Sequence, residues 1–317
     1  MPELPEVETI RRTLAPWLLN KRVERLIVRN GAVLKVSSRR LREAVVGSRI
    51  LGLDRRGKFL IFQFPGFAVV FHLGMTGQLT LRNPAKADAP GFFRHAATGL
   101  ERTRQHAPDR HTHLRIVLEG GMILQYRDVR KFGKVFLVPA GESGLHAFFS
   151  HLGLEPFTDQ FSLAAFLSKL SGRRSLVKAA LLDQSLIAGV GNIYADEALF
   201  VAGIHPRRRV HRVRRWEKEA LLGAIELVLE KGIRFGGTTF RDYIDSDGER
   251  GRNQEELFVY GRQGMACRRC GSELQKIVVV QRGTHFCPLC QPRSGRKRPD
   301  DFEMIGTRFP ERGKDRQ

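Results

Sequence analysis

The 317-residue sequence has no apolar run near the roughly 20 residues that span a bilayer, which excludes a transmembrane helix. A basic leader is also missing, because Glu3, Glu6 and Glu8 stand where a secretory signal peptide carries positive charge. We therefore expect a cytoplasmic protein. Cysteine is scarce, with four residues that all lie between positions 267 and 290. Because cytoplasmic thiols stay reduced, this cluster indicates a metal site before disulfides.

Acidic residues are few beside basic ones, 33 Asp and Glu against 54 Lys and Arg, which leaves a net charge of +21. Such an excess attracts a polyanion, and nucleic acid is the leading candidate. An anionic membrane surface, or a basic protein whose arginines are merely solvated, are the alternatives. Hydrophobic residues make up 42% of the chain, which is typical of a globular protein, and the length suffices for two domains.

The spacing of apolar residues divides the chain into two parts. A helix is predicted from Pro5 to about Asn20, and strands dominate from there to Pro139. The double glycine at 120–121 predicts a hairpin turn, and Asn83–Arg110 lacks periodicity and is expected to be a long loop. The predicted strands include Lys58–Phe64, Ala68–His72, His113–Glu119, Met122–Tyr126 and Lys134–Val138.

After Pro139 the pattern becomes helical. The run Arg207–Arg215 holds six arginines and a histidine; we interpret it as a solvated loop, with phosphate contact as the alternative. Residues 292–317 are polar and charged, which predicts a disordered basic tail. The predicted helices are Leu163–Leu170, Leu176–Asp183, Asn192–Val201 and Arg214–Lys231.

The cysteines form two C-x-x-C pairs separated by sixteen residues, which is the spacing of a tetrahedral zinc site: Cys267, Cys270, Cys287 and Cys290. Four thiolates leave no open position for a catalytic water, so one structural Zn²⁺ is expected. The spacer predicts a β-hairpin of Lys276–Arg282 and Thr284–Cys287 that turns at Gly283. Arg282 would then lie at the hairpin tip, directed away from the metal.

Pro2 and Glu3 suggest chemistry at the N-terminus. If Met1 is removed, Pro2 carries a free secondary amine beside a carboxylate. An α-amino group has a pKa of roughly 8, so part of it is neutral and able to attack a sugar carbon and form a Schiff base. The alternative is structural, because many chains begin Met-Pro and Pro-Glu also opens a helix well.

A glycine-containing turn joins two predicted helices within Leu181–Tyr194. Gly189 and Gly191 permit a close approach of the backbone, and Asn192 is a suitable N-cap. Free amides at a helix N-terminus bind phosphate, so a helix-turn-helix unit is one interpretation. Ordinary helix packing around a glycine turn is the other.

The N-terminal run Met1–Thr9, the Leu181–Tyr194 segment and the Cys267–Cys290 module occur in the same order in bacterial formamidopyrimidine-DNA glycosylases. The chain resembles this family from Pro2 to about Gln291. The resemblance implies an α+β protein: a β-sandwich flanked by helices (2–140), a helix–two-turn–helix domain (141–262) and a zinc finger (263–291). It also implies removal of oxidised purines, such as 8-oxoguanine and formamidopyrimidines, from double-stranded damaged DNA, then β,δ-elimination at the abasic site, by a monomer near the nucleoid.

The family's catalytic residues match five positions of this sequence. Pro2 resembles the nucleophile that attacks C1′, and Glu3 resembles the general acid/base. Glu6 resembles a buried supporting acid near them. Lys58 resembles a lysine that contacts phosphate at the lesion, and Arg282 resembles the zinc-finger arginine that grips the flanking phosphates.

Five further positions resemble residues that bind DNA. Met75, Arg130 and Phe132 match three residues that fill the void left by a flipped base, which suits an extrusion that costs a few kcal/mol. Lys178 and Asn192 match phosphate ligands.

Two alternatives remain open. One is an endonuclease VIII-type enzyme for oxidised pyrimidines, although the N-terminal run and the Met75, Arg130 and Phe132 set favour the purine enzyme. The other is a non-catalytic zinc protein that binds DNA and needs no free Pro2. The chain also departs from the family where His111-Thr112-His113 replaces an acid between two histidines, and we assign that run no role.

Overall fold

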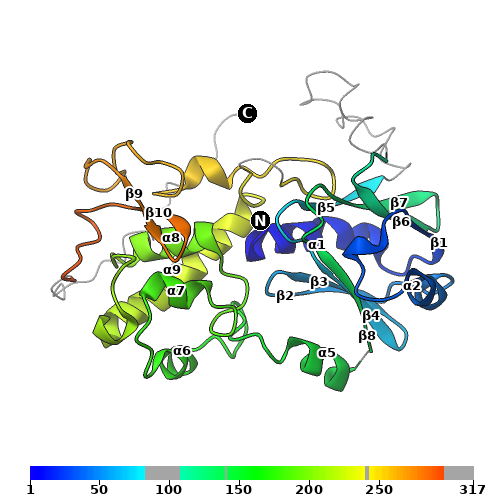
Figure 1. The fold of residues 1–317 in the computed structure, drawn as a ribbon, viewed down its shortest axis with the longest axis horizontal. Coiled ribbons are helices and arrows are strands. Elements are labelled where there is room, and N and C mark those ends of the chain that lie inside the picture. Colours follow the sequence, from blue (N-terminus) through cyan, green and yellow to red (C-terminus); the bar gives the residue numbers. More distant parts are fainter. Residues whose placement is uncertain (83–107, 140, 240–242, 296–317) are drawn as a thin grey trace, which may run out of the picture. The chain divides into compact units, whose positions relative to one another are not determined.

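The computed structural model describes residues 1–82, 108–139, 141–239 and 243–295 (Figure 1). Most of the loop predicted at Asn83–Arg110, and all but the first residues of the predicted tail, lie outside the described residues. The chain divides into two compact units. Unit 1 contains residues 1–156, 187–190 and 229–256, and unit 2 contains residues 157–186, 191–228 and 257–317. The domain boundaries near 140, 262 and 291 stay a prediction.

Unit 1 is built on two four-stranded antiparallel sheets. Apolar residues from both sheets join one core, in which the rings of Phe62 and Phe71 lie 5.2 Å apart and those of Phe71 and Tyr126 lie 5.7 Å apart. The predicted β-sandwich is therefore confirmed. One sheet has the order β1 (Val23–Val28), β6 (Thr112–Leu118), β7 (Met122–Asp128), β5 (Gly77–Arg82), and the other β2 (Gly52–Arg56), β3 (Phe59–Phe64), β4 (Phe67–His72), β8 (Lys134–Pro139).

Among the described residues of unit 1, helices α1 (Leu4–Leu18), α2 (Ser38–Val45) and α5 (Glu142–Phe149) flank the sandwich. Helix α1 buries Ile10 and Leu14 in the core, as its apolar spacing predicts. Helix α5 packs on the outer face of the β2–β3–β4–β8 sheet. Helix α2 was not predicted, because its eight residues carry few apolar positions; the Ser37 hydroxyl caps it by accepting from the Arg40 amide.

Local turn chemistry agrees with the predicted hairpin between β6 and β7. Gly120 and Gly121 have φ angles of 83° and 74°, a left-handed conformation that glycine adopts without steric cost. Short 3₁₀ turns occur at Gly31–Val33, Val210–Arg212 and Asn253–Glu256.

Unit 2 holds the predicted helices and the zinc-finger hairpin. Helices α6 (Leu163–Leu170), α7 (Val177–Leu182) and α8 (Asn192–Val201) match their predicted ranges closely, and α9 (Arg215–Arg234) contributes residues to both units. The hairpin pairs β9 (Gln275–Val279) with β10 (Arg282–Phe286). Within the described ranges, no helix combines the length and apolarity that crossing a membrane requires.

The predicted position of the zinc-finger turn is wrong. Arg282 pairs with Val279, so the tip consists of Val280 and Gln281, both left-handed with φ of 50° and 58°. Gly283 instead lies within β10 opposite Val278. Arg282 is thus the first residue after the tip, and its side chain is exposed.

Candidate active site and nucleic-acid interface

The residues that follow the exposed Met1 are buried in unit 1 and are hydrogen-bonded to α1 and to Gly189. Pro2 is buried and Glu3 is 3% exposed. The Glu3 amide donates to Glu6 Oε2 at 2.8 Å in a capping box, and the Leu4 amide donates to the Gly189 carbonyl at 3.0 Å. Both bonds fix where the Pro2 nitrogen lies at the entrance of α1.

Glu6 links the N-terminus to the segment after α9. Its side chain is buried, and its Oε1 accepts from the Thr238 amide at 2.8 Å. Gly237 is left-handed at φ 83°, and a Cβ there would lie 3.0 Å from Glu6 Cγ. Burial, assisted by the charge of Glu6, raises the pKa of Tyr243 well above its usual range, so this phenol stays protonated beside the carboxylate.

Lys58 lies in the turn between β2 and β3 and points to the same loop as the N-terminus. It is 6% exposed, and its Nζ donates to the Val190 carbonyl at 2.9 Å. A Cβ on Gly57 would lie 3.1 Å from Ala188, so the two backbones approach closely. Lys58 therefore contacts the 187–190 segment directly, and the N-terminal residues reach the same segment through the Leu4 amide, whereas Glu6 contacts residues 237–238. Sequence spacing alone did not show these contacts.

His72 is a neighbour that sequence reasoning did not assign. His72 of β4 pairs with Phe59 of β3, and Phe59 directly follows Lys58 in the chain. Burial and then the charge of Lys58 lower the pKa of His72 to about 4, so the imidazole is neutral at neutral pH.

Glu155 was also missed, and it supports the Lys58 turn. Its carboxylate accepts from the side chains of Arg55 and Arg56 and, at 2.9 Å, from the Gly57 amide. No local motif marks Glu155, because its partners lie about a hundred positions earlier in the chain. The turn that carries Lys58 is thus held by a buried carboxylate.

Glu8 joins the same charge network from the first turns of α1. Burial opposes its ionisation, but hydrogen bonds from Arg11 and Arg12, together with the charges of Arg11 and Arg55, outweigh burial and lower the pKa of Glu8 to about 2.

The three predicted void-filling residues lie together. Arg130 Nη1 is 3.3 Å from Met75 Sδ, and its guanidinium carbon is 4.6 Å from the centroid of the Phe132 ring. Met75 is 37% and Phe132 is 52% exposed, although both are large apolar residues. An exposed Met and Phe held by an arginine suit insertion between bases, and this role stays a prediction.

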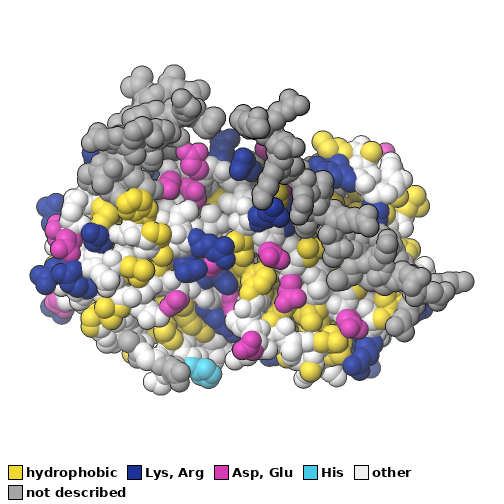
Figure 2. Space-filling view, turned by 180° about the vertical axis from the view of Figure 1, so that it is seen from behind, with side chains coloured by type: hydrophobic (Ala, Val, Ile, Leu, Met, Phe, Trp, Pro, Cys, Tyr) yellow, Lys and Arg dark blue, Asp and Glu magenta, His cyan; other side chains and the backbone are white. Residues whose placement is uncertain are grey.

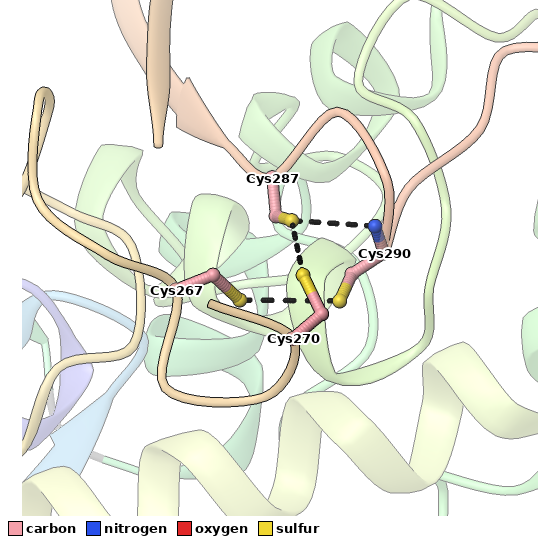
Figure 3. Close-up of side chains that lie close together, drawn as sticks. All are labelled: Cys267, Cys270, Cys287 and Cys290. Carbon is pink, nitrogen blue, oxygen red and sulfur yellow. Dashed lines mark hydrogen bonds between the residues drawn. The ribbon is translucent and has the colours of Figure 1, made fainter. Parts of the chain in front are cut away.

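The four cysteines of unit 2 come together at one point (Figure 3). Their sulfur atoms all lie within 4.8 Å of one another, with separations of 3.9 Å for Cys267–Cys290 and 3.5 Å for Cys270–Cys287. Sulfurs at 2.3 Å from a tetrahedral zinc are about 3.8 Å apart, so the donors fit the ion. A disulfide requires about 2.05 Å and is excluded at these distances. The expectation of one structural zinc is confirmed.

Asn192 occupies a different place from the one predicted. Gly191 is the N-cap of α8 and Asn192 is the first helical residue, so the predicted cap is wrong. The reason is a distant partner: Asn192 Nδ2 donates to the Gly283 carbonyl at 3.0 Å and to Tyr260 Oη at 3.4 Å. Its Oδ1 is buried without a partner among the described residues.

Lys178 is fully buried in unit 2. Its Nζ donates to Asp196 Oδ1 at 2.6 Å, to Thr284 Oγ1 at 2.7 Å and to the Gly283 carbonyl at 3.3 Å. Lys178 and Asn192 therefore meet at the strand that begins with Arg282. Only Arg282 of these three presents an exposed cation, and the phosphate-binding roles of all three stay predictions.

The arginine run is not simply a solvated loop. Arg208 is buried and forms a bidentate pair with Glu217, whereas Arg207, Arg209 and Arg212 are exposed. On the face seen in Figure 2, Lys and Arg side chains are interspersed with Asp and Glu. The net charge alone therefore does not locate a DNA contact on that face, and phosphate contact by the run stays a prediction.

Three family models match consecutive parts of the chain. They describe the formamidopyrimidine-DNA glycosylase N-terminal domain (residues 1–135), the formamidopyrimidine-DNA glycosylase H2TH domain (152–243) and a zinc finger found in FPG and IleRS (265–293).

Relatives match over almost the whole chain. The formamidopyrimidine-DNA glycosylase of Desulfitobacterium hafniense is 43% identical over 92% of this chain and 100% of its own, and that of Thermomicrobium roseum is 43% identical over 92% and 99%. The Lactococcus lactis Fpg bound to DNA containing an abasic site is 36% identical, with a TM-score of 0.79 over 92% of this chain and 99% of that one. The wild-type complex with DNA containing N7-benzyl-Fapy-dG gives 36% identity and 0.79 over 92% and 100%. The chain belongs to the formamidopyrimidine-DNA glycosylase family.

Proposed function

We propose that this protein is a base-excision-repair glycosylase that removes oxidised purines from double-stranded DNA and then cleaves the abasic strand. The observation that carries the proposal is that the Leu4 amide, two residues after the buried Pro2, and the Lys58 side chain both bind carbonyls of residues 189–190, with Glu6 bound to the Glu3 amide. Membership of the glycosylase family supports the substrate class, because relatives of this name and a structure of a relative bound to N7-benzyl-Fapy-dG DNA match 92% of the chain. A monomer that acts on the bacterial nucleoid fits this activity.

The proposed chemistry begins when Met1 is removed and Pro2 becomes a secondary amine. The neutral amine attacks C1′ of the damaged nucleotide, the glycosidic bond breaks, and the base leaves with the proton that the Pro2 nitrogen releases. Glu3 protonates the sugar oxygen as the ring opens, which leaves an iminium ion between Pro2 and C1′.

The iminium acidifies the C2′ protons, so loss of one proton expels the 3′ phosphate by β-elimination, and a second elimination expels the 5′ phosphate. Water then hydrolyses the remaining iminium, which releases the sugar remnant as an aldehyde and frees the Pro2 amine. Lys58 supplies a cation near the developing phosphate charge, and Arg282 holds the flanking phosphates. The four cysteines hold zinc as a structural ion, which orders the hairpin and takes no part in these steps.

The experiment is borohydride trapping, which reduces the iminium to a stable bond. We expect the processed wild-type protein to give a covalent adduct with an 8-oxoguanine duplex, mapped to Pro2 by mass spectrometry. Pro2→Gly, and a form that retains Met1, should give less than about a tenth of that adduct. The Met1 form is the matched control, because it keeps every side chain and blocks only the amine.

Other outcomes separate the alternatives. Stronger cleavage of a thymine glycol duplex than of an 8-oxoguanine duplex would indicate the endonuclease VIII-type activity. Lesion binding without any adduct or cleavage would indicate a non-catalytic DNA-binding protein. An adduct that persists at full yield with Met1 retained would remove Pro2 from the mechanism.

A further inference from the structure

One buried carboxylate joins the two loops that carry the exposed Met75, Arg130 and Phe132. Asp128 ends β7 and is 0% exposed. Its Oδ1 accepts from Thr76 Oγ1 at 2.5 Å and from the Arg130 amide at 3.2 Å. Its Oδ2 accepts from the Gly133 amide at 2.8 Å and from Tyr126 Oη at 3.3 Å.

These four donors come from both loops and from the sheet beneath them. Thr76 follows Met75 directly, and its Oγ1 also accepts from the Arg130 amide at 3.1 Å. The Arg130 and Gly133 amides bracket Phe132. Among the described residues, no cation lies in a salt bridge with Asp128, so its hydrogen bonds to neutral donors have to balance the cost of burial.

Two further contacts restrict the arrangement of Asp128. Burial, then the charge of Asp128, raises the pKa of Tyr126, so the phenol stays a donor. His113 Nε2 lies 2.7 Å from the Asp128 carbonyl oxygen and fixes the backbone of the same residue.

Backbone contact locks the two loops against each other. Gly74 is left-handed at φ 63°, and a Cβ there would lie 2.5 Å from the Gly133 nitrogen. A Cβ on Gly133 would lie 1.9 Å from Tyr126 Oη. Neither position has room for a side chain, so the loop of Gly74 and the loop of Gly133 pack closely against each other.

We propose that Asp128 is a positioning residue that holds Met75, Arg130 and Phe132 as one rigid wedge for the space of an extruded base. The inference rests on the proposed function, because only a glycosylase that opens the duplex needs such a wedge. Inserting side chains between stacked bases costs a few kcal/mol, and a preorganised wedge avoids the further cost of ordering loops in the complex. In this proposal Asp128 takes no part in the reaction itself; it acts through the three residues that it holds.

The test uses Asp128→Asn in the zinc-loaded full chain. An amide cannot accept from all four donors, since its NH₂ group faces one pair of them. We expect excision from an 8-oxoguanine duplex to fall by about tenfold or more. Trapping on single-stranded abasic DNA, which needs no wedge, should stay within about twofold of wild type. The fluorescence of 2-aminopurine beside an abasic analogue in a duplex should also report weaker unstacking.

Controls make the result specific. Asp54→Asn makes the same chemical change at an exposed acid on β2 and should leave all three measurements unchanged. Thr76→Val removes the hydroxyl that donates to Asp128, with little change of side-chain shape. It replaces Asp128→Asn as the test variant if Asp128→Asn does not fold. In a Met75→Ala background, Asp128→Asn should cost less than in wild type, because both changes act through the wedge.

Three results would overturn the inference. They are wild-type excision by Asp128→Asn, equal losses on duplex and single strand, and strict additivity with Met75→Ala. The proposed function fails separately, if the wild-type protein itself leaves 8-oxoguanine in the duplex.

Discussion

Replacing Lys178 by Met tests whether this lysine supports the zinc-finger hairpin or contacts DNA. The ion pair with Asp196 has a side-chain exposure of 0% on both partners. Removing one member of such a buried pair costs about 3–5 kcal/mol, because the remaining charge loses its partner. After the change, the Asp196 carboxylate keeps the His285 amide at 2.8 Å, which offsets a small part of that cost.

Urea unfolding of the zinc-loaded protein measures the loss. Trp216 lies in the part of α9 that belongs to unit 2, so a Trp17→Phe background lets fluorescence report this unit. Lys178→Met with Asp196→Asn should recover at least half of the lost free energy, because the amide keeps an acceptor for His285 without a buried charge. A loss below about 1 kcal/mol for the single variant would refute the argument from burial.

The same variants decide the predicted phosphate contact. A lysine that binds one phosphate changes the slope of log K against log salt by about 0.9. The exposed Arg282 gives the reference, and Arg282→Ser should lower the slope by this amount. We expect the Lys178→Met/Asp196→Asn variant to keep the wild-type slope, and a decrease would instead support direct contact.

Three further predictions follow from the geometry. Chelating zinc should abolish DNA binding while circular dichroism still reports the folded sandwich of unit 1, and retained affinity after verified metal loss would contradict the structural role. Gly189→Ala should lower the free energy of unfolding, measured by thermal denaturation, by more than about 2 kcal/mol, because Gly189 has a φ of 92° and the new Cβ would lie 2.7 Å from Leu4. The control is Gly172→Ala, where φ is 69° and nothing lies within 4 Å of the new Cβ. This variant should lose only about 1–2 kcal/mol, which is what the backbone strain costs. Glu8→Gln should lower the free energy of unfolding at pH 7 by up to about 3 kcal/mol, because the folded-state pKa of Glu8 is depressed to about 2. The contribution of Glu8 is complete above about pH 4.5 and is lost as the pH falls to about 2. At that pH the variant and the wild type should have the same free energy of unfolding.

Local patterns were sufficient for most of the fold. The apolar spacing of α1, the short apolar runs of β3, β4 and β7, and the glycine pair at 120–121 each specify a structure within a few residues. The cysteine spacing likewise specified the metal site, since the distance along the chain sets how the two knuckles meet.

The errors have a common cause, which is competition from distant partners. The turn was placed at Gly283 because glycine favours turns, yet the register that pairs Ile277 with Thr284 moves the tip to Val280–Gln281. Asn192 does not cap its helix because its amide binds a carbonyl 91 positions later. Glu155 carries no local signal, since its partners lie about a hundred positions earlier, and the Thr76 partner that ties Asp128 to the other loop lies 52 positions earlier.

The Asp128 carboxylate, which binds both loops of the wedge, has a consequence for protein engineering. Residues 73–77 and 128–133 cannot be exchanged between relatives one at a time, because a transplanted strip would meet a foreign counterpart across the Gly74–Gly133 contact. A chimera would have to carry both strips, with their Thr76 and Asp128, so these two separate stretches of sequence form a single unit for engineering.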